Sequence, residues 1–113
     1  FMDTMKAQGI TFNIIVRGAA MSAAALLLTC GTGNRMISKH SKIMVHQLST
    51  VVVGKLNDVK SNAKFSEELE SDCNTLMAKY SNEDKAYWEN ISSSDFFMSS
   101  ERAKELGIVD VII

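Results

Sequence analysis

Two side chains of the sequence, Ser22 and His46, have the types that nucleophilic catalysis at a carbonyl carbon requires. Ser22 lies in a run of small apolar residues, RGAAMSAAALLL, where a β-rich segment is expected to end and a helix to begin. Backbone N–H groups at the start of a helix point toward developing negative charge, so the residue after the serine can supply one donor of an oxyanion hole. His46 follows the apolar run IMV at 43–45, and a histidine at a strand end lies at the rim of a sheet, where the sites of α/β folds gather. The other histidine, His40, stands in a polar turn and is the weaker candidate for a base.

Asp95 is the acid whose setting differs from that of the other carboxylates. Most acids fall on expected helix faces, where a solvated role is typical: Glu67, Glu68, Glu70, Asp72, Glu83 and Asp84. Asp95 instead stands between a serine run and the apolar run FFM, and a carboxylate at such a boundary can orient a histidine. Each candidate also has a structural interpretation: Ser22 as a filler of a buried helix, His46 as a half-buried strand residue, and Asp95 as a turn or cap residue.

The elements expected around Ser22 and His46 form an α/β unit. Residues 10–16, ITFNIIV, are rich in β-branched side chains and predict a buried strand. Residues 21–29 predict a helix that is apolar on all sides and therefore buried. Short strands are predicted at 35–37 and 43–45. The order strand, helix, strand indicates a crossover unit with a parallel sheet.

The second half of the chain is dominated by a long helical pattern. A β-prone stretch at 49–53 ends at Gly54, and apolar residues then recur at helical spacing from Leu56 to about Tyr80. Such a helix is about 35 Å long, so it must project from a small domain or pack on a neighbour. Three shorter helices are expected: one at 1–8, one after the cap at 81–84, and one at 100–106, between Ser99 and Gly107. Short strands are expected at 96–98 and 109–113.

The composition is that of an ordinary globular domain and excludes several functions. The 113 residues are 46% hydrophobic and 22% charged, with a net charge of −1 and no basic block, so nucleic acid and anionic membranes are poor partners. The longest apolar stretch, 19–30, is shorter than the roughly 20 residues of a membrane span. Cys30 and Cys73 lack CxxC spacing and predict free thiols in a reducing compartment. No metal-ligand spacing or glycine-rich phosphate loop occurs, so no metal and no cofactor are expected.

Three motifs together, GAAMSAAALLL, KIMVHQ and SDFFMSSERAKELGIVD, resemble the ClpP family, the serine peptidases that form the proteolytic subunit of the Clp protease. Gly18 and Ser22 match the family's G-x-x-x-S segment, 44–47 match its M-[IV]-H-Q segment, and the stretch from Asp95 to Asp110 matches its closing motif. The likeness covers essentially the whole chain. It implies an α/β, ClpP/crotonase-like fold of repeated β-β-α units with a long projecting handle helix.

The resemblance implies a role for each of four residues. Ser22 would be the nucleophile, His46 the general base and then acid, and Asp95 the carboxylate that orients the imidazole and stabilises the imidazolium. The Ala23 N–H would supply one oxyanion donor.

The family also implies substrate contacts and partners. Leu48, Ser49 and Val51, which follow the histidine, would border the substrate and pair with it as an added strand. The implied substrates are unfolded polypeptides. They would be delivered by an AAA+ unfoldase of the ClpX, ClpA or ClpC type to a homo-oligomer, a heptameric ring and in some forms a double ring, in the cytoplasm or an organelle.

The chain also departs from the family pattern. The family's Pro-Gly-Gly loop, which supplies the other oxyanion donor, is not among these 113 residues. Three single positions also differ: Leu48 stands where the family has a proline, Val51 where it has a glycine, and Ser94 where it often has an arginine. We therefore expect a divergent, N-terminally truncated protease domain over 1–113, with a head at approximately 1–48 and 92–113 and a handle at approximately 49–91. Two alternatives stay open: a phage-type maturation protease, and a non-catalytic ClpP-like or crotonase-like ring subunit. Retention of all three catalytic residue types argues against the second alternative.

Overall fold

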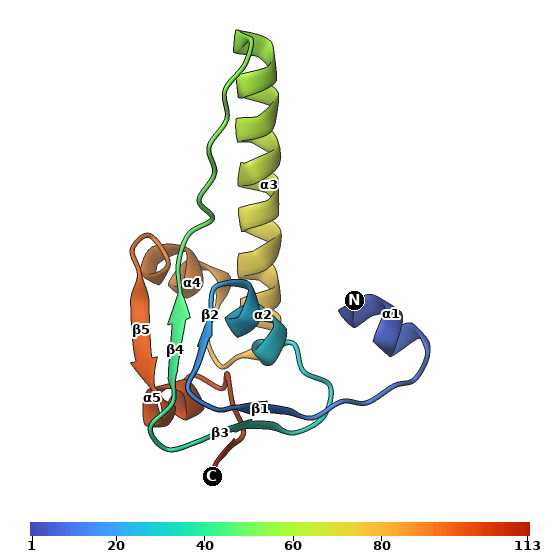
Figure 1. Ribbon diagram of the computed structural model, residues 1–113, viewed down its shortest axis with the longest axis vertical. Helices are drawn as coiled ribbons and strands as arrows, with labels where there is room; N and C mark the ends of the chain where they lie inside the picture. Colours follow the sequence, from blue (N-terminus) through green and yellow to red (C-terminus); the bar gives the residue numbers. More distant parts are fainter.

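Two three-stranded sheets and five helices make up the computed structural model, which describes residues 1–113 (Figure 1). The α/β class expected from the sequence is confirmed. The elements in chain order are α1 (Met2–Ala7), β1 (Ile14–Val16), β2 (Ala19–Met21), α2 (Ala23–Thr29), β3 (Arg35–Ile37), β4 (Lys42–Val45), α3 (Leu56–Tyr80), α4 (Lys85–Ile91), β5 (Phe96–Ser99), α5 (Ser100–Glu105) and β6 (Val111–Ile112).

Each β-β-α unit sends one strand into each sheet. One sheet has the order β1-β3-β6 with parallel pairs, and the other has the order β2-β4-β5, in which β4 and β5 are antiparallel. The chain turns from β1 into β2 at Gly18, whose φ of +93° is one that a side chain would disfavour. Buried Ser41 closes this corner, because its hydroxyl accepts the Gly18 N–H at 2.9 Å and donates to the Val16 carbonyl at 3.3 Å.

The prediction of a helix from residue 21, buried on all sides, is wrong in two respects. Residues Ala19–Met21 form β2, because they pair in parallel with β4 and the hydrogen bonds of this ladder outweigh the helix propensity of alanine. The helix itself, α2, starts at Ala23 and buries one face through Ala25, Leu28 and Thr29. The other face stays exposed, since only one side of α2 packs against the sheet.

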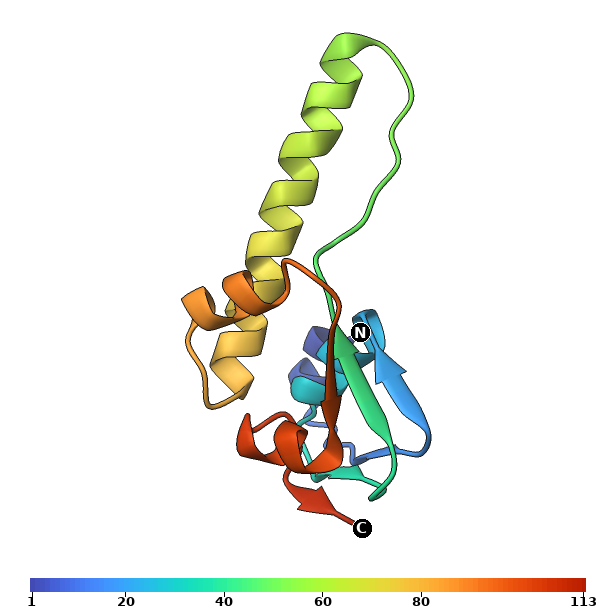
Figure 2. The ribbon, with the colours of Figure 1, turned by 90° about the vertical axis from the view of Figure 1, so that its left-hand side faces the viewer.

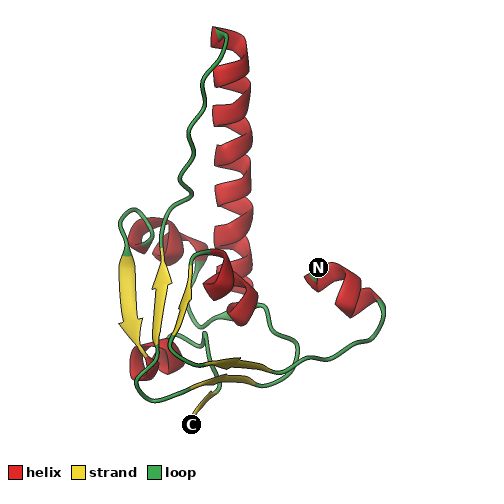
Figure 3. Ribbon diagram, in the orientation of Figure 1, coloured by secondary structure: helices red, strands yellow, loops and turns green.

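Helix α3 projects from the body of the molecule, whose longest dimension is 50 Å (Figures 1 and 2). Its bounds agree with the prediction, and its buried residues, Asn74 and Met77, lie in the half nearest the sheets. The segment between β4 and α3 runs along the outer half of the helix as a loop (Figure 3). The β-prone stretch at 49–53 therefore forms no strand, because no neighbouring strand pairs with it, and Val51 and Val53 are 91% and 94% exposed.

The remaining short elements follow their local signals. The strand predicted at 10–16 shortens to β1, and the predicted strands at 35–37 and 43–45 are present as β3 and β4. Ser99 caps α5 by accepting the Arg102 N–H, and Gly107 ends it at a φ of +73°. The division of the chain into head and handle stays a prediction. None of the helices combines the length and the apolar composition that a membrane crossing requires.

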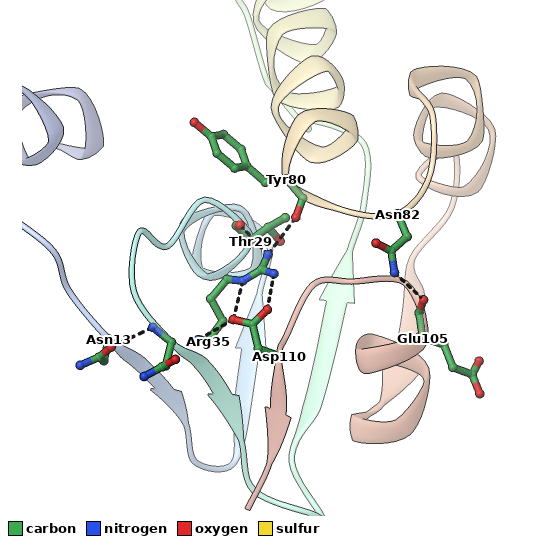
Figure 4. Close-up of polar contacts among 8 residues, drawn as sticks. Asn13, Thr29, Arg35, Tyr80, Asn82, Glu105 and Asp110 are labelled. Carbon is green, nitrogen blue, oxygen red and sulfur yellow. Dashed lines mark hydrogen bonds and ion pairs between the residues drawn. The ribbon is translucent and has the colours of Figure 1, made fainter.

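Arg35 joins four elements through one guanidinium group (Figure 4). It makes a bidentate pair with Asp110, just before β6, at 2.6 and 3.1 Å. It also donates to the carbonyls of Thr29, at the end of α2, and Tyr80, at the end of α3, at 3.0 and 2.8 Å. The side chain of Arg35 is only 15% exposed. The hydrogen bonds that Asp110 accepts from Arg35 hold the pKa of its carboxyl group below the usual range.

We predict that Arg35→Ala lowers the free energy of unfolding by at least about 2 kcal/mol, because it removes several hydrogen bonds of a charged group. Urea denaturation followed by the fluorescence of Trp88, the single tryptophan, measures the loss. The matched control is Arg102→Ala, which removes a surface pair with Glu105 and leaves the midpoint nearly unchanged. Equal midpoints for Arg35→Ala and the native protein would contradict the prediction.

The lowered pKa of Asp110 also predicts a pH dependence. A carboxyl group whose pKa is depressed by folding stabilises the folded state above its ordinary pKa of 3.8, and this contribution disappears as the pH falls through the lowered value. The stability difference between the native protein and Arg35→Ala should therefore be constant from pH 5 to 7 and shrink below about pH 3.8. Denaturation midpoints measured across this pH series test the expectation, and a difference that grows toward acid pH would refute it.

Candidate active site

Ser22 occupies a strained turn between a strand and a helix. It directly follows β2 and precedes α2, with φ 56° and ψ −122°, and it is the only residue other than glycine with a positive φ. Its backbone N–H donates to the Met44 carbonyl of β4 at 2.9 Å, so the turn is anchored to the neighbouring strand. Such a conformation costs about 1–3 kcal/mol and exposes the side chain at the sheet edge. Strained strand-to-helix turns of this kind hold nucleophilic serines in hydrolases.

His46 stands beside Ser22 because their strands are parallel neighbours. Met21 of β2 lies opposite Met44 of β4, so both chains leave the same edge of the sheet. The His46 Nε2 lies 2.9 Å from the Ser22 Oγ, a hydrogen-bond distance. The backbone after His46 is also fixed, since the Gln47 N–H donates to the Ser92 carbonyl at 2.7 Å. This geometry suits transfer of the hydroxyl proton to the imidazole.

Asp95 faces the other side of the imidazole. It directly precedes β5, whose antiparallel register sets Phe96 opposite Val45, the residue before His46. The Asp95 Oδ1 lies 3.8 Å from the His46 Nδ1, which is within ion-pair range and longer than a hydrogen bond. The Asp95 side chain is 62% exposed. The structure thus brings Ser22, His46 and Asp95 together in the order that an acyl-transfer site uses.

The Ala23 N–H adjoins the serine at the first position of α2. The first N–H groups of a helix have no intrahelical acceptor, so this donor can bind an oxygen of a bound group. The side chain of Ala23 is small and lines the cavity beside Ser22, so a backbone or a carbonyl group can approach closely.

A cavity of about 250 Å³ opens next to Ser22 and His46; we name it the apolar pocket. Eight of its thirteen lining residues are hydrophobic. Leu48, one of the three predicted substrate-binding residues, belongs to its wall. Ser49 and Val51 lie on the exposed segment beyond it.

Helix α3 supplies most of the pocket residues that the sequence did not single out: Leu69, Glu70, Cys73, Asn74 and Met77. Three of them, Leu69, Cys73 and Met77, recur every four residues and share one helix face, which is a signal that the sequence contains. It could not indicate which part of the chain this face meets. Glu70, expected on a solvated helix face, is half-buried, and its Oε2 accepts the Leu48 N–H at 2.7 Å.

Of the other histidine and the two cysteines, only Cys73 lines the apolar pocket. His40 is exposed in the turn between β3 and β4, as expected. Both cysteines are free, as predicted, and burial raises the pKa of the Cys30 and Cys73 thiols. No three His, Cys, Asp or Glu side chains are grouped so that they could hold a metal ion.

Comparison with known proteins relates the whole chain to one family. Residues 1–113 match the sequence model of the family described as Clp protease. The ATP-dependent Clp protease proteolytic subunit 2 of Mycobacterium bovis and that of Mycobacterium tuberculosis are 31% identical to it over 98% of this chain and 53% of their own length. Proteolytic subunit 1 of the ATP-dependent Clp protease of Mycolicibacterium paratuberculosis is also 31% identical, over 98% of this chain and 54% of its own. The chain therefore spans about half the length of the curated relatives it matches.

The backbone strain at Ser22 predicts that the variant with the smaller side chain, Ser22→Gly, is more stable than Ser22→Ala. Glycine adopts a positive φ without steric penalty, so Ser22→Gly should have a free energy of unfolding about 1 kcal/mol higher than Ser22→Ala, after allowance for the greater freedom of unfolded glycine. Urea denaturation of the two variants measures the difference. If Ser22→Ala proved the more stable of the pair, the backbone at this turn would be unstrained.

Proposed function

Because the chain belongs to the Clp protease family, we propose that the protein is a serine endopeptidase that hydrolyses peptide bonds of unfolded proteins through Ser22, His46 and Asp95. The observation that carries this proposal is the 2.9 Å contact between the Ser22 Oγ and the His46 Nε2 at a strained strand-to-helix turn. A structural serine in a helix would need neither the strain nor a histidine partner.

The proposed reaction proceeds through an acyl-enzyme. His46 Nε2 takes the hydroxyl proton as the Ser22 Oγ attacks the peptide carbonyl carbon, and the Ala23 N–H donates to the resulting oxyanion. His46 then gives the proton to the leaving amine, and the C–N bond breaks. A water molecule attacks the ester in the same way and regenerates Ser22.

Asp95 has an electrostatic role in this scheme. At 3.8 Å from the His46 Nδ1, its carboxylate stabilises the imidazolium and favours the tautomer that leaves Nε2 free to accept a proton. Contacts of this kind often shorten when substrate binds, because catalytic hydrogen bonds of empty sites are commonly long.

The segment after His46 suits an extended substrate. Residues 49–53 have no strand partner, so their backbone groups are available to pair with a peptide as an added strand. We assign Leu48, Ser49 and Val51 to this binding edge, with Leu48 also forming the wall of the apolar pocket. The substrate backbone would then lie across Ser22 with one side chain in the pocket.

The proposal extends to assembly. The relatives are named as proteolytic subunits of an ATP-dependent protease, which favours a homo-oligomeric ring, heptameric and single or double, fed by an AAA+ unfoldase of the ClpX, ClpA or ClpC type. The projecting α3 carries exposed apolar residues, Leu56 and Phe65 among them, that suit packing between subunits of a head-and-handle design. The free thiols fit a cytoplasmic or organellar location.

Active-site labelling of the complete protein tests the proposal. A fluorophosphonate probe should label Ser22, and Ser22→Ala should abolish labelling and lower peptide hydrolysis by about a thousandfold or more, as should His46→Ala. Asp95→Asn should lower hydrolysis less, because Asp95 acts through the imidazole. Ser61→Ala, an exposed serine on α3, is the matched control and should label like the native protein. Labelling that survives in Ser22→Ala would exclude Ser22 as the nucleophile.

A further inference from the structure

The wall of the apolar pocket contains one acidic residue, Glu70, which comes from α3. Its carboxylate is held in place by two neutral donors: the Leu48 N–H at 2.7 Å and the Asn74 Nδ2 at 3.3 Å. It takes part in none of the four ion pairs of the structure. A carboxylate has about four acceptor positions, so Glu70 keeps both acceptor capacity and an uncompensated negative charge.

The pocket continues past Glu70 into a second hollow, which we name the acidic groove. This groove has a volume of about 440 Å³ and shares Leu48, Glu70 and Asn74 with the apolar pocket. Its lining adds Glu67 and Glu89 and contains no lysine or arginine. Lys85 lies near the edge of the groove. Its Nζ donates to the Ser71 hydroxyl at 2.6 Å and forms an ion pair with Glu89 at 3.9 Å. A side chain in the apolar pocket therefore has mostly apolar neighbours and one carboxylate, that of Glu70, on the side that the pocket shares with the acidic groove.

We propose that Glu70 is a specificity-determining residue and that the apolar pocket takes a lysine or arginine side chain, on the residue whose carbonyl Ser22 attacks. The methylene stem of such a side chain packs against walls such as Leu26 and Met77, and its cationic end reaches Glu70. The charge of Glu70 is then paired, and a charge-assisted hydrogen bond forms in a partly desolvated place. This inference rests on the proposed function, since it names the substrate class of the same site.

The test compares short peptide substrates on the complete, assembled protease. The probes are acetylated tripeptide aminomethylcoumarins that end in lysine, arginine, leucine or norleucine. Norleucine is the sharpest comparison, because it has the lysine stem without the amine. The native protein should show a kcat/KM at least about tenfold higher for lysine than for norleucine, since a hydrogen bond to a charged group supplies that discrimination.

Two variants of Glu70 and one matched control make the test specific. Glu70→Gln keeps an oxygen for the Leu48 N–H and removes the charge, so the ratio of kcat/KM for the lysine peptide to that for the norleucine peptide should fall to about one. Glu70→Asp keeps the charge on a shorter stem and should retain part of the preference. Glu67 lies one helical turn from Glu70 and lines only the acidic groove. The matched control, Glu67→Gln, should therefore leave the ratio unchanged.

Each outcome decides between the proposals. Active-site titration with the fluorophosphonate comes first: a protein in which Ser22 is not labelled removes the proposed function and this inference with it. A labelled protein that cleaves after leucine or norleucine in preference to lysine overturns the role of Glu70 alone. So does a lysine preference that survives in Glu70→Gln or disappears equally in Glu67→Gln. The denaturation midpoint of Glu70→Gln, followed by Trp88, shows whether the variant is folded.

Discussion

The parallel pairing of β2 with β4 is the interaction on which the rest of the candidate site depends. Its register sets Met21 opposite Met44, and the Ser22 N–H extends it by donating to the Met44 carbonyl. Since parallel strands end at the same edge of a sheet, the residues that follow them emerge side by side. A slip of one residue would turn the His46 side chain to the other face of the sheet and remove its 2.9 Å contact with Ser22.

The outer and inner parts of helix α3 have different roles. Its outer part projects, with apolar side chains such as Phe65 exposed, and its inner part packs into the core through Met77 and forms the wall of the apolar pocket. Arg35 ties the end of this helix to α2 and to the segment before β6, so the pocket wall is held against the turn that carries Ser22. Any shift of α3 relative to the sheets would therefore change the pocket and the position of Glu70 together.

Local signals predicted those elements whose stability is mainly local. The bounds of α3 follow from apolar spacing over seven turns, and α5 follows from the Ser99 cap and the Gly107 stop. The same signals failed where a distant partner decides. Met21 was expected to begin the helix and is the last residue of β2, because β4 pairs with Ala19–Met21. The valines at 51–53 have strand-forming side chains and remain unpaired, because no strand lies beside them.

The sequence by itself determined which side chains could do chemistry and placed each at the end of an element, because residue type and strand or helix termini are local properties. Ser22, His46 and Asp95 were found in this way, and their order and spacing resemble one family. Only the tertiary structure decided their distances, the 3.8 Å separation of Asp95 from His46, and the entry of Glu70 into the pocket wall. These depend on strand register and on the packing of α3 against the sheets, and both are contacts between residues far apart in the chain.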